Sequence, residues 1–222
     1  MNETTNYQIP TTRYQLKPGL SLIEFLTGFA IIGVIAIMIG SVWLAHSKIY
    51  STQSATIDAQ SASTIAIDEI ANQIRESNGV VYSCLIQNPC ESDTSGITLV
   101  LQVWPLNASG VPFDPGSNDP DYIVYRLNDP PNDKNFVKSV YANNTTGSTR
   151  KELNKKILAS NVDSINFTYL ANDGTTEIAP GPGLTETAQV IITVYFKAET
   201  IYDRTEPEPI PKAKKVILRN KE

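Results

Sequence analysis

An uncharged apolar stretch near the N-terminus, Phe25–Ala45, constrains the fold of this chain more than any other feature. As an α-helix its 21 residues would extend about 31 Å, enough to cross the hydrocarbon core of a bilayer. The hydroxyls of Thr27 and Ser41 can donate to carbonyls of the same helix, so both residues are compatible with a membrane helix. The alternative is a buried helix of a soluble domain, but such helices are seldom apolar on every side over this length. The stretch therefore predicts a single transmembrane helix.

The charges on either side of this stretch predict its orientation. Arg13 and Lys17 precede it, and Glu3 is the only acid before the edge residue Glu24. Lys48 follows it and weakens the asymmetry without reversing it. Because positive charge favours the cytoplasmic side, we expect a cytoplasmic N-terminus and an extracytoplasmic C-terminal domain. A cleaved secretory signal is an alternative, but no Ala-x-Ala-like site follows Leu44.

The residues just before the apolar stretch combine two unusual features. Positions 17–24 read Lys-Pro-Gly-Leu-Ser-Leu-Ile-Glu, so a carboxylate stands at the edge of the predicted span. Placing a carboxylate at the edge of a membrane span costs free energy, so a specific role for this acid is expected. One simple reason is that Glu24 reaches the headgroups from a helix end. In addition, the small residue Gly19 precedes the apolar run, whereas secretory signals are cut after it.

This junction resembles the leader of the type IV pilin-like family, which includes the pseudopilins of secretion and DNA-uptake systems. The family pattern is a short basic leader ending in Gly, then Phe-Thr-Leu-Ile-Glu or a near variant, then an unbroken apolar helix. Here Leu20 and Ser21 stand where Phe and Thr are commonest. The resemblance implies that prepilin peptidase cuts after Gly19 and that Leu20 becomes an N-methylated N-terminus. It also implies that Glu24 positions the subunit in a filament by facing the amine of a neighbour.

The helix is expected to continue beyond the membrane, because no Pro or Gly occurs from Ser41 to Asn78. Ile67, Ile70 and Ile74 are spaced as one apolar helix face, and Asn78-Gly79 is a common C-terminal stop. Further apolar anchors and a polar face complete this amphipathic part: Ile49, Ile57 and Ile65, and Asp68, Glu69, Arg75 and Glu76. The predicted organisation is a leader (1–19), a transmembrane part (20–46), an amphipathic part (47–78) and a β-rich domain (79–222).

Short β-rich runs follow Gly79, and the economical assembly is an antiparallel sheet packed on the second half of the helix. The fold class predicted is therefore α+β, and it is pilin-like. The expected strands are Val80–Ile86, Ile97–Trp104, Tyr122–Leu127, Phe136–Tyr141, Ser164–Leu170, Gln189–Lys197 and Lys215–Leu218. Long loops are expected at Pro105–Asp121, Asn128–Asn135, Ala142–Lys151 and Gly174–Thr187. The run from Ile157 to Gly174 resembles a stretch of minor pilin-like subunits, especially the larger J-type pseudopilins.

Two further sites can be proposed from residue types. Cys84 and Cys90 are the only cysteines, and outside the cytoplasm a disulfide between them is expected, with Asn88-Pro89 turning the chain. Acids at Asp114, Asp119 and Asp121 could gather around Ca²⁺, although their spacing does not match an EF-hand and solvated loop acids are commoner. No metal site and no other cofactor is predicted.

Enzymatic chemistry is not indicated by the sequence. There is no Gly-x-Ser-x-Gly and no phosphate-binding glycine loop, and the only histidine is His46 at the membrane edge. The net charge of −5 argues against broad nucleic-acid binding. The exception is a basic C-terminal tail, which contains Lys212, Lys214, Lys215, Arg219 and Lys221. These residues are interpreted either as solvated charge beside a last strand or as a contact with DNA.

The function expected from these features is that of a minor pilin or pseudopilin in the inner membrane. Its partners would be prepilin peptidase and other pilin-like subunits, which it would contact through the N-terminal helix. The alternative is a single-pass, membrane-anchored binding or adhesin domain that never assembles. An anchored hydrolase is a third and weaker reading.

Overall fold

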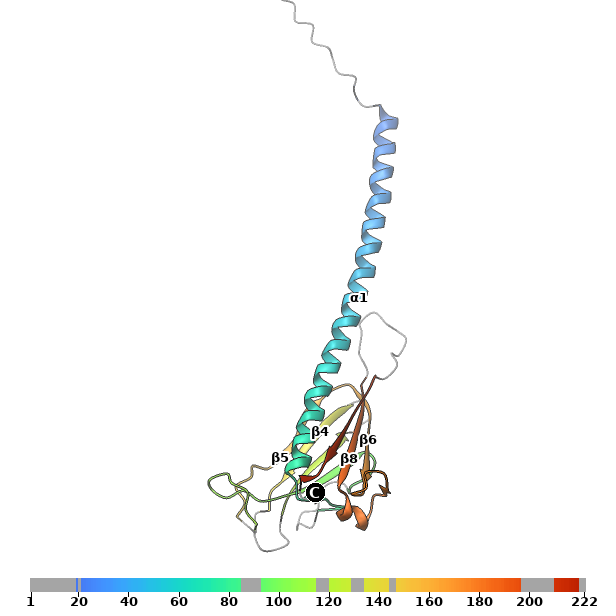
Figure 1. Ribbon diagram of the computed structural model, residues 1–222. Helices are drawn as coiled ribbons and strands as arrows, with labels where there is room; N and C mark the ends of the chain where they lie inside the picture. Colours follow the sequence, from blue (N-terminus) through green and yellow to red (C-terminus); the bar gives the residue numbers. More distant parts are fainter. Residues whose placement is uncertain are drawn as a thin grey trace, which may run out of the picture. The chain divides into compact units, whose positions relative to one another are not determined.

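The computed structural model describes residue 19 and residues 21–84, 93–114, 120–128, 134–143, 147–196 and 210–219. The chain divides into two compact units, Met1–Ser47 and Lys48–Glu222. One long helix, α1 (Leu22–Glu76), begins in the first unit and ends in the second, where its last turns pack against antiparallel sheets (Figure 1). The predicted α+β fold, with a long N-terminal helix on an antiparallel sheet domain, is confirmed.

Helix α1 is 55 residues long, and its fully buried side chains are confined to its last four turns. They are Ser63, Ala66, Ile67, Ile70, Ala71 and Ile74. The predicted apolar face is therefore confirmed. The prediction that Ile49, Ile57 and Ile65 are further anchors is wrong, because these side chains are 56%, 63% and 65% exposed. Residues eight apart are about 80° apart around a helix, so these three cannot share one face.

The helix ends two residues before the predicted stop, by another mechanism. After Glu76, the N–H and the hydroxyl of Ser77 both bond to the carbonyl oxygen of Ile74, at 3.2 Å and 2.7 Å. The N–H of Asn78 then bonds to the carbonyl of Gln102, at 2.8 Å, which starts sheet pairing at once. Gly79 has no positive φ, so the expected left-handed glycine cap is absent. Sheet pairing, together with the Ser77 hydroxyl, ends the helix.

Two antiparallel sheets form the rest of the second unit. The first sheet runs in the order β1-β2-β3-β4-β5, with strands Gly79–Val80, Thr98–Val103, Asp121–Asn128, Asn135–Tyr141 and Leu153–Ala159. The second runs in the order β7-β6-β8-β9, with strands Glu177–Ile178, Val162–Leu170, Gln189–Phe196 and Ile210–Ile217. A short 3₁₀ helix, η2 (Pro182–Glu186), precedes β8. Consecutive strands therefore pair throughout the first sheet, while β8 pairs with β6 and β9 in the second.

The structure corrects the predicted strands at four places. The first strand stops at Val80, so the predicted Val80–Ile86 is wrong over 81–84, and 85–86 lie outside the described residues. Strand β5 was not predicted, because its central residues are polar and exposed. Strand β7 lies inside the loop predicted for Gly174–Thr187. Strand β9 begins at Ile210 and ends at Ile217, whereas Lys215–Leu218 was expected.

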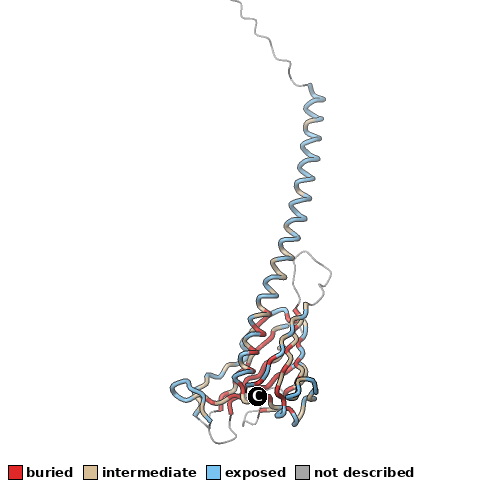
Figure 2. Tube along the Cα trace, viewed as in Figure 1, coloured by how far each residue is buried: buried red, intermediate tan, exposed pale blue. Residues whose placement is uncertain are grey.

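The core lies between the two sheets and the last turns of α1. Alternate side chains of β6 and β8 point into this core. Ile165, Phe167 and Tyr169 of β6 are at most 3% exposed, and so are the inward residues of β8 (Val190, Ile192, Val194 and Phe196). Figure 2 shows buried segments gathered where the last turns of α1 meet the strands. Each such side chain contributes about 1.5–3 kcal/mol relative to an exposed one. The predicted alternation in these two strands is confirmed.

Two neighbouring acids attach α1 to both sheets. Glu69 accepts a hydrogen bond from Lys138 Nζ of β4 at 2.9 Å, and Lys156 Nζ of β5 lies 3.9 Å from its other oxygen. Asp68 binds Lys214 Nζ of β9 at 2.5 Å, and this contact lowers the pKa of the Asp68 carboxyl. The sequence placed both acids on a polar face of the helix; Glu69 instead faces the first sheet, and its side chain is only 28% exposed.

Candidate functional site: the start of helix α1

The first turn of α1 contains a reciprocal pair of hydrogen bonds between Ser21 and Glu24. The backbone N–H of Ser21 donates to Glu24 Oε2 at 3.0 Å, and the N–H of Glu24 donates to Ser21 Oγ at 3.3 Å. This is a capping box, in which a serine before the helix and a glutamate at its third position satisfy backbone donors of the first turn. The negative charge also lies at the positive end of the helix dipole. The carboxylate therefore has partners inside its own chain.

Gly19, the expected last residue of the leader, contributes nothing to packing in the described part of the chain. Gly19 is exposed, and a Cβ placed on it would meet no atom within 4 Å. The fold therefore does not require glycine at this position. Leu20, the expected methylation site, and the leader before Gly19 lie outside the described residues.

The apolar part of α1 is exposed along its length. Across its most apolar 18-residue window none of the residues is buried, and mean hydropathy there is 2.5. Thr27 Oγ1 donates to the carbonyls of Ile23 and Glu24, at 2.9 Å and 3.0 Å, and Ser41 Oγ donates to Met38 O at 2.8 Å. The two hydroxyls therefore return to the helix backbone as expected. By length and composition this helix could span a membrane.

The candidate disulfide is described only at one end. Cys84 is 8% exposed, packs beside Val100 and Tyr122, and is disulfide-bonded. Its expected partner, Cys90, lies outside the described residues, as does the Asn88-Pro89 turn. The pairing of these two cysteines stays a prediction.

One of the three acids considered for calcium has a different role. Asp121, at the start of β3, is completely buried, and its carboxylate binds Arg150 Nε at 2.9 Å. It also accepts the Ser148 hydroxyl at 2.7 Å and the Asn143 N–H at 2.8 Å. These donors occupy both of its oxygens, so Asp121 serves the fold. Asp119 lies outside the described residues, and within the described ranges no three His, Cys, Asp or Glu residues group as metal ligands.

The basic C-terminal tail is divided by the alternation of β9. Lys212 and Lys214 face α1, where they bind the Thr64 hydroxyl and the Asp68 carboxylate. Lys215 and Arg219 are exposed, and Lys221 lies outside the described residues. Because half of the described basic residues are used in packing α1, the tail does not present the continuous charge that a nucleic-acid backbone contact favours.

Sequence reasoning missed the capping box and the helix-docking acids. The capping box had a readable signal, since Ser-x-x-Glu before an apolar run marks a helix start. The pairs formed by Asp68 and Glu69 had none, because each joins residues at least 69 positions apart. Comparison with known proteins adds no assignment: no protein-family model matches the chain, and no curated protein matches it.

Proposed function

We propose that this chain is a minor pilin or pseudopilin, a membrane-stored structural subunit of a type IV pilus or a type II secretion-like filament. The observation that carries the proposal is the start of α1. A helix of 55 residues begins three positions after Gly19, its first turn holds Glu24, and its apolar residues are unburied. A processing signal, a fixed carboxylate and an exposed apolar helix are the three parts that assembly through an N-terminal helix requires.

The capping box supplies a mechanism for the carboxylate. A carboxylate in lipid is costly unless it has partners, and the N–H of Ser21 and the helix dipole provide them before any neighbour arrives. Cleavage after Gly19 would leave the amine of Leu20 one residue before this N–H. Glu24 of a stored subunit would then be partly compensated, and the amine of a neighbouring subunit would add the missing charge.

Transfer of the helix from lipid into a filament involves little change in hydrophobic free energy. Lipid tails and a bundle of apolar helices are similarly apolar, so packing and polar contacts decide association. Gly28, Gly33 and Gly40 have open space around them, which would allow close approach of another helix. The role is structural rather than catalytic, and a tip, initiation or adaptor position is proposed from the resemblance of the Ile157–Gly174 run to minor subunits.

Processing is tested by mass spectrometry of the full chain, expressed with and without a prepilin peptidase and extracted from membranes. The expected mature N-terminus is methylated Leu20, and Gly19→Val should keep the leader. An intact Met1 in the presence of the peptidase would contradict the proposal.

Assembly is tested by crosslinking through cysteines placed within Leu22–Ala45, with two variants that separate the roles of the first turn. Glu24→Gln keeps a side chain that can complete a capping box but removes the charge, whereas Ser21→Ala keeps the charge and removes the serine cap. The proposal expects crosslinks to other subunits to fall at least tenfold in Glu24→Gln and much less in Ser21→Ala. A processed chain without any such crosslinks would instead support a membrane-anchored binding domain.

A further inference from the structure

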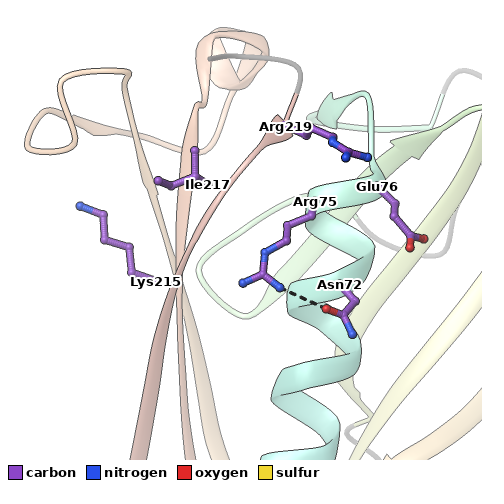
Figure 3. A pocket seen from close by; sticks show the side chains of 6 residues that line it. All are labelled: Asn72, Arg75, Glu76, Lys215, Ile217 and Arg219. Carbon is purple, nitrogen blue, oxygen red and sulfur yellow. Dashed lines mark hydrogen bonds between the residues drawn. The ribbon is translucent and has the colours of Figure 1, made fainter.

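A surface hollow of about 570 Å³ lies between the last turn of α1 and the end of β9. Its walls are Asn72, Arg75 and Glu76 from the helix and Lys215, Ile217 and Arg219 from the strand and the residues after it (Figure 3). A hollow of this size is within the range of small-molecule sites. Nothing in the proposed assembly uses it, so its role is independent of that proposal.

The two arginines enter this hollow from different elements. Arg75 reaches from α1 toward β9, while Arg219 reaches from the end of β9 over the end of the helix (Figure 3). Arg75 Nη1 donates to Asn72 Oδ1 at 3.1 Å, a bond that orients the guanidinium and leaves its other N–H groups available. Among the residues that the structure describes, neither arginine forms an ion pair.

The remaining charges favour a doubly negative ligand. Lys215 Nζ donates to the carbonyl of Gly174, at 3.1 Å, and its side chain leads away from α1 (Figure 3), so its charge lies at the outer edge of the hollow. Glu76 accepts a hydrogen bond from Gln73 at 3.3 Å and is the only acid among the described residues of the wall. The described residues of the wall, three cations and one carboxylate, carry a net charge of +2, on a chain whose net charge is −5.

From this arrangement we propose that the hollow binds a compact phosphate group, with Arg75 and Arg219 as its two ligands. A guanidinium binds two oxygens in one plane, so a single arginine saturates a carboxylate. A tetrahedral phosphate has oxygens for two guanidiniums that approach in different planes, and near pH 7 a phosphate monoester carries about two negative charges. The rest of the acidic surface repels a long polyanion, which favours an isolated phosphate group.

The test is calorimetric titration of the full chain in a non-ionic detergent at fixed ionic strength. One arm uses inorganic phosphate and glycerol phosphate, a second uses micelles doped with phosphatidic acid, and acetate is the control anion. Binding of phosphate in either arm, with acetate at least tenfold weaker, is expected, and the arm that binds identifies a free phosphate or a lipid headgroup as the source. Absence of binding in both arms overturns the proposal.

Variants separate a built site from general electrostatic attraction. The double variant Arg75→Gln with Arg219→Gln should weaken phosphate binding at least tenfold. Arg75→Lys with Arg219→Lys keeps the charge but loses the planar donors, and it should still weaken binding severalfold. Lys151→Gln removes an exposed charge that does not line the hollow, and it should leave phosphate binding unchanged. Equal weakening in Lys151→Gln, or full binding by the double lysine variant, would overturn the assignment. All three side chains are exposed, so unchanged melting curves are expected.

Discussion

Glu69 of α1 accepts a hydrogen bond from Lys138 of β4 across 2.9 Å, and Lys138 Nζ also lies 5.8 Å from the centre of the Tyr125 ring. The Lys138 side chain is only 13% exposed, so water compensates little of its charge. The pair joins the helix to the middle of the first sheet. Burial, and secondly the charges of Glu69 and Glu76, raise the pKa of the Tyr125 hydroxyl well above its usual range.

Glu69→Gln should lower the free energy of unfolding by about 1–3 kcal/mol, because the Lys138 ammonium would remain charged and largely buried without its counterion. The matched control is Glu76→Gln, an exposed acid near the end of the same helix that forms no ion pair among the described residues. It should change stability by less than about 0.5 kcal/mol. Denaturant unfolding of the full chain in detergent measures both, and equal effects would contradict the docking role of Glu69.

Ile70→Ala should lower the free energy of unfolding by about 2–5 kcal/mol, since the Ile70 side chain of α1 is completely buried in the core. Ile57→Ala removes the same atoms from a side chain that is 63% exposed, so it should be within about 0.5 kcal/mol of the parent. The two variants share a helix and a chemistry and differ in burial. A large loss of thermal stability in Ile57→Ala would show that this face is buried in the folded chain.

Asp121→Asn should be among the most damaging single changes, at about 3–5 kcal/mol. The substitution keeps the shape of the side chain but leaves the Arg150 guanidinium without its buried carboxylate. Arg150 Nη2 also donates to the carbonyl of Trp104, at 2.8 Å. Loss of the Asp121 carboxylate should therefore loosen both the segment that begins at Trp104 and the segment that carries Arg150. The control is Glu152→Gln, an exposed acid nearby. Hydrogen exchange of the backbone amides in residues 104–113 and 147–150 should become faster in Asp121→Asn and stay unchanged in Glu152→Gln.

The turn at Asp173 should make stability depend on acid pH. The Thr176 hydroxyl, the Thr176 N–H and the Thr175 N–H bind its carboxylate and hold the pKa of Asp173 well below its ordinary value. A lowered folded pKa gives a stabilisation that is present above the unfolded value, near pH 4, and is lost as pH falls toward the folded one. Asp173→Asn should melt below the parent at pH 6, and the difference should shrink steadily as pH falls from about 4 toward 2. A constant difference across this range would contradict the assignment.

The disulfide prediction concerns Cys84 and Cys90. Closing so short a loop contributes about 2 kcal/mol in the chain-entropy model, so reduction should lower the melting temperature modestly. Peptide mapping without reductant should recover residues 84 and 90 in one linked fragment. Two thiols that react freely in the folded, unreduced chain would contradict the pairing.

The strands that sequence reasoning found are those whose side chains alternate. Phe167 and Ile192 lie in runs where every second residue is apolar, because one face of each strand meets the core. Strand β5 lacks that pattern: Asn154, Lys155 and Lys156 are exposed, and Lys155 has a φ of 54° where the pairing with β4 shifts register. A bulged edge strand is specified by its neighbour rather than by its own periodicity.

The boundary of β9 was misplaced for a related reason. Pro211, Lys212 and Lys214 suggested a charged tail, but β9 pairs only with β8, and an edge strand tolerates both proline and lysine. Lys214 binds the Asp68 carboxylate and Lys212 binds the Thr64 hydroxyl of α1, and these long-range contacts have no local signal. At the start of the helix the signal was local: Ser21 and Glu24 stand three residues apart, and the pattern alone was sufficient to expect a capping box.

The confinement of buried side chains in α1 to Ser63–Ile74 separates two kinds of mutation. Substitutions at the six buried positions of that segment change the stability of the second unit. Substitutions between Leu22 and Ala45 leave the core contacts of the described residues intact, so their effects are expected through whatever surrounds the helix. Natural variation in the first segment therefore records the demands of whatever surrounds the helix, and variation at the buried positions of the second records the packing of this chain.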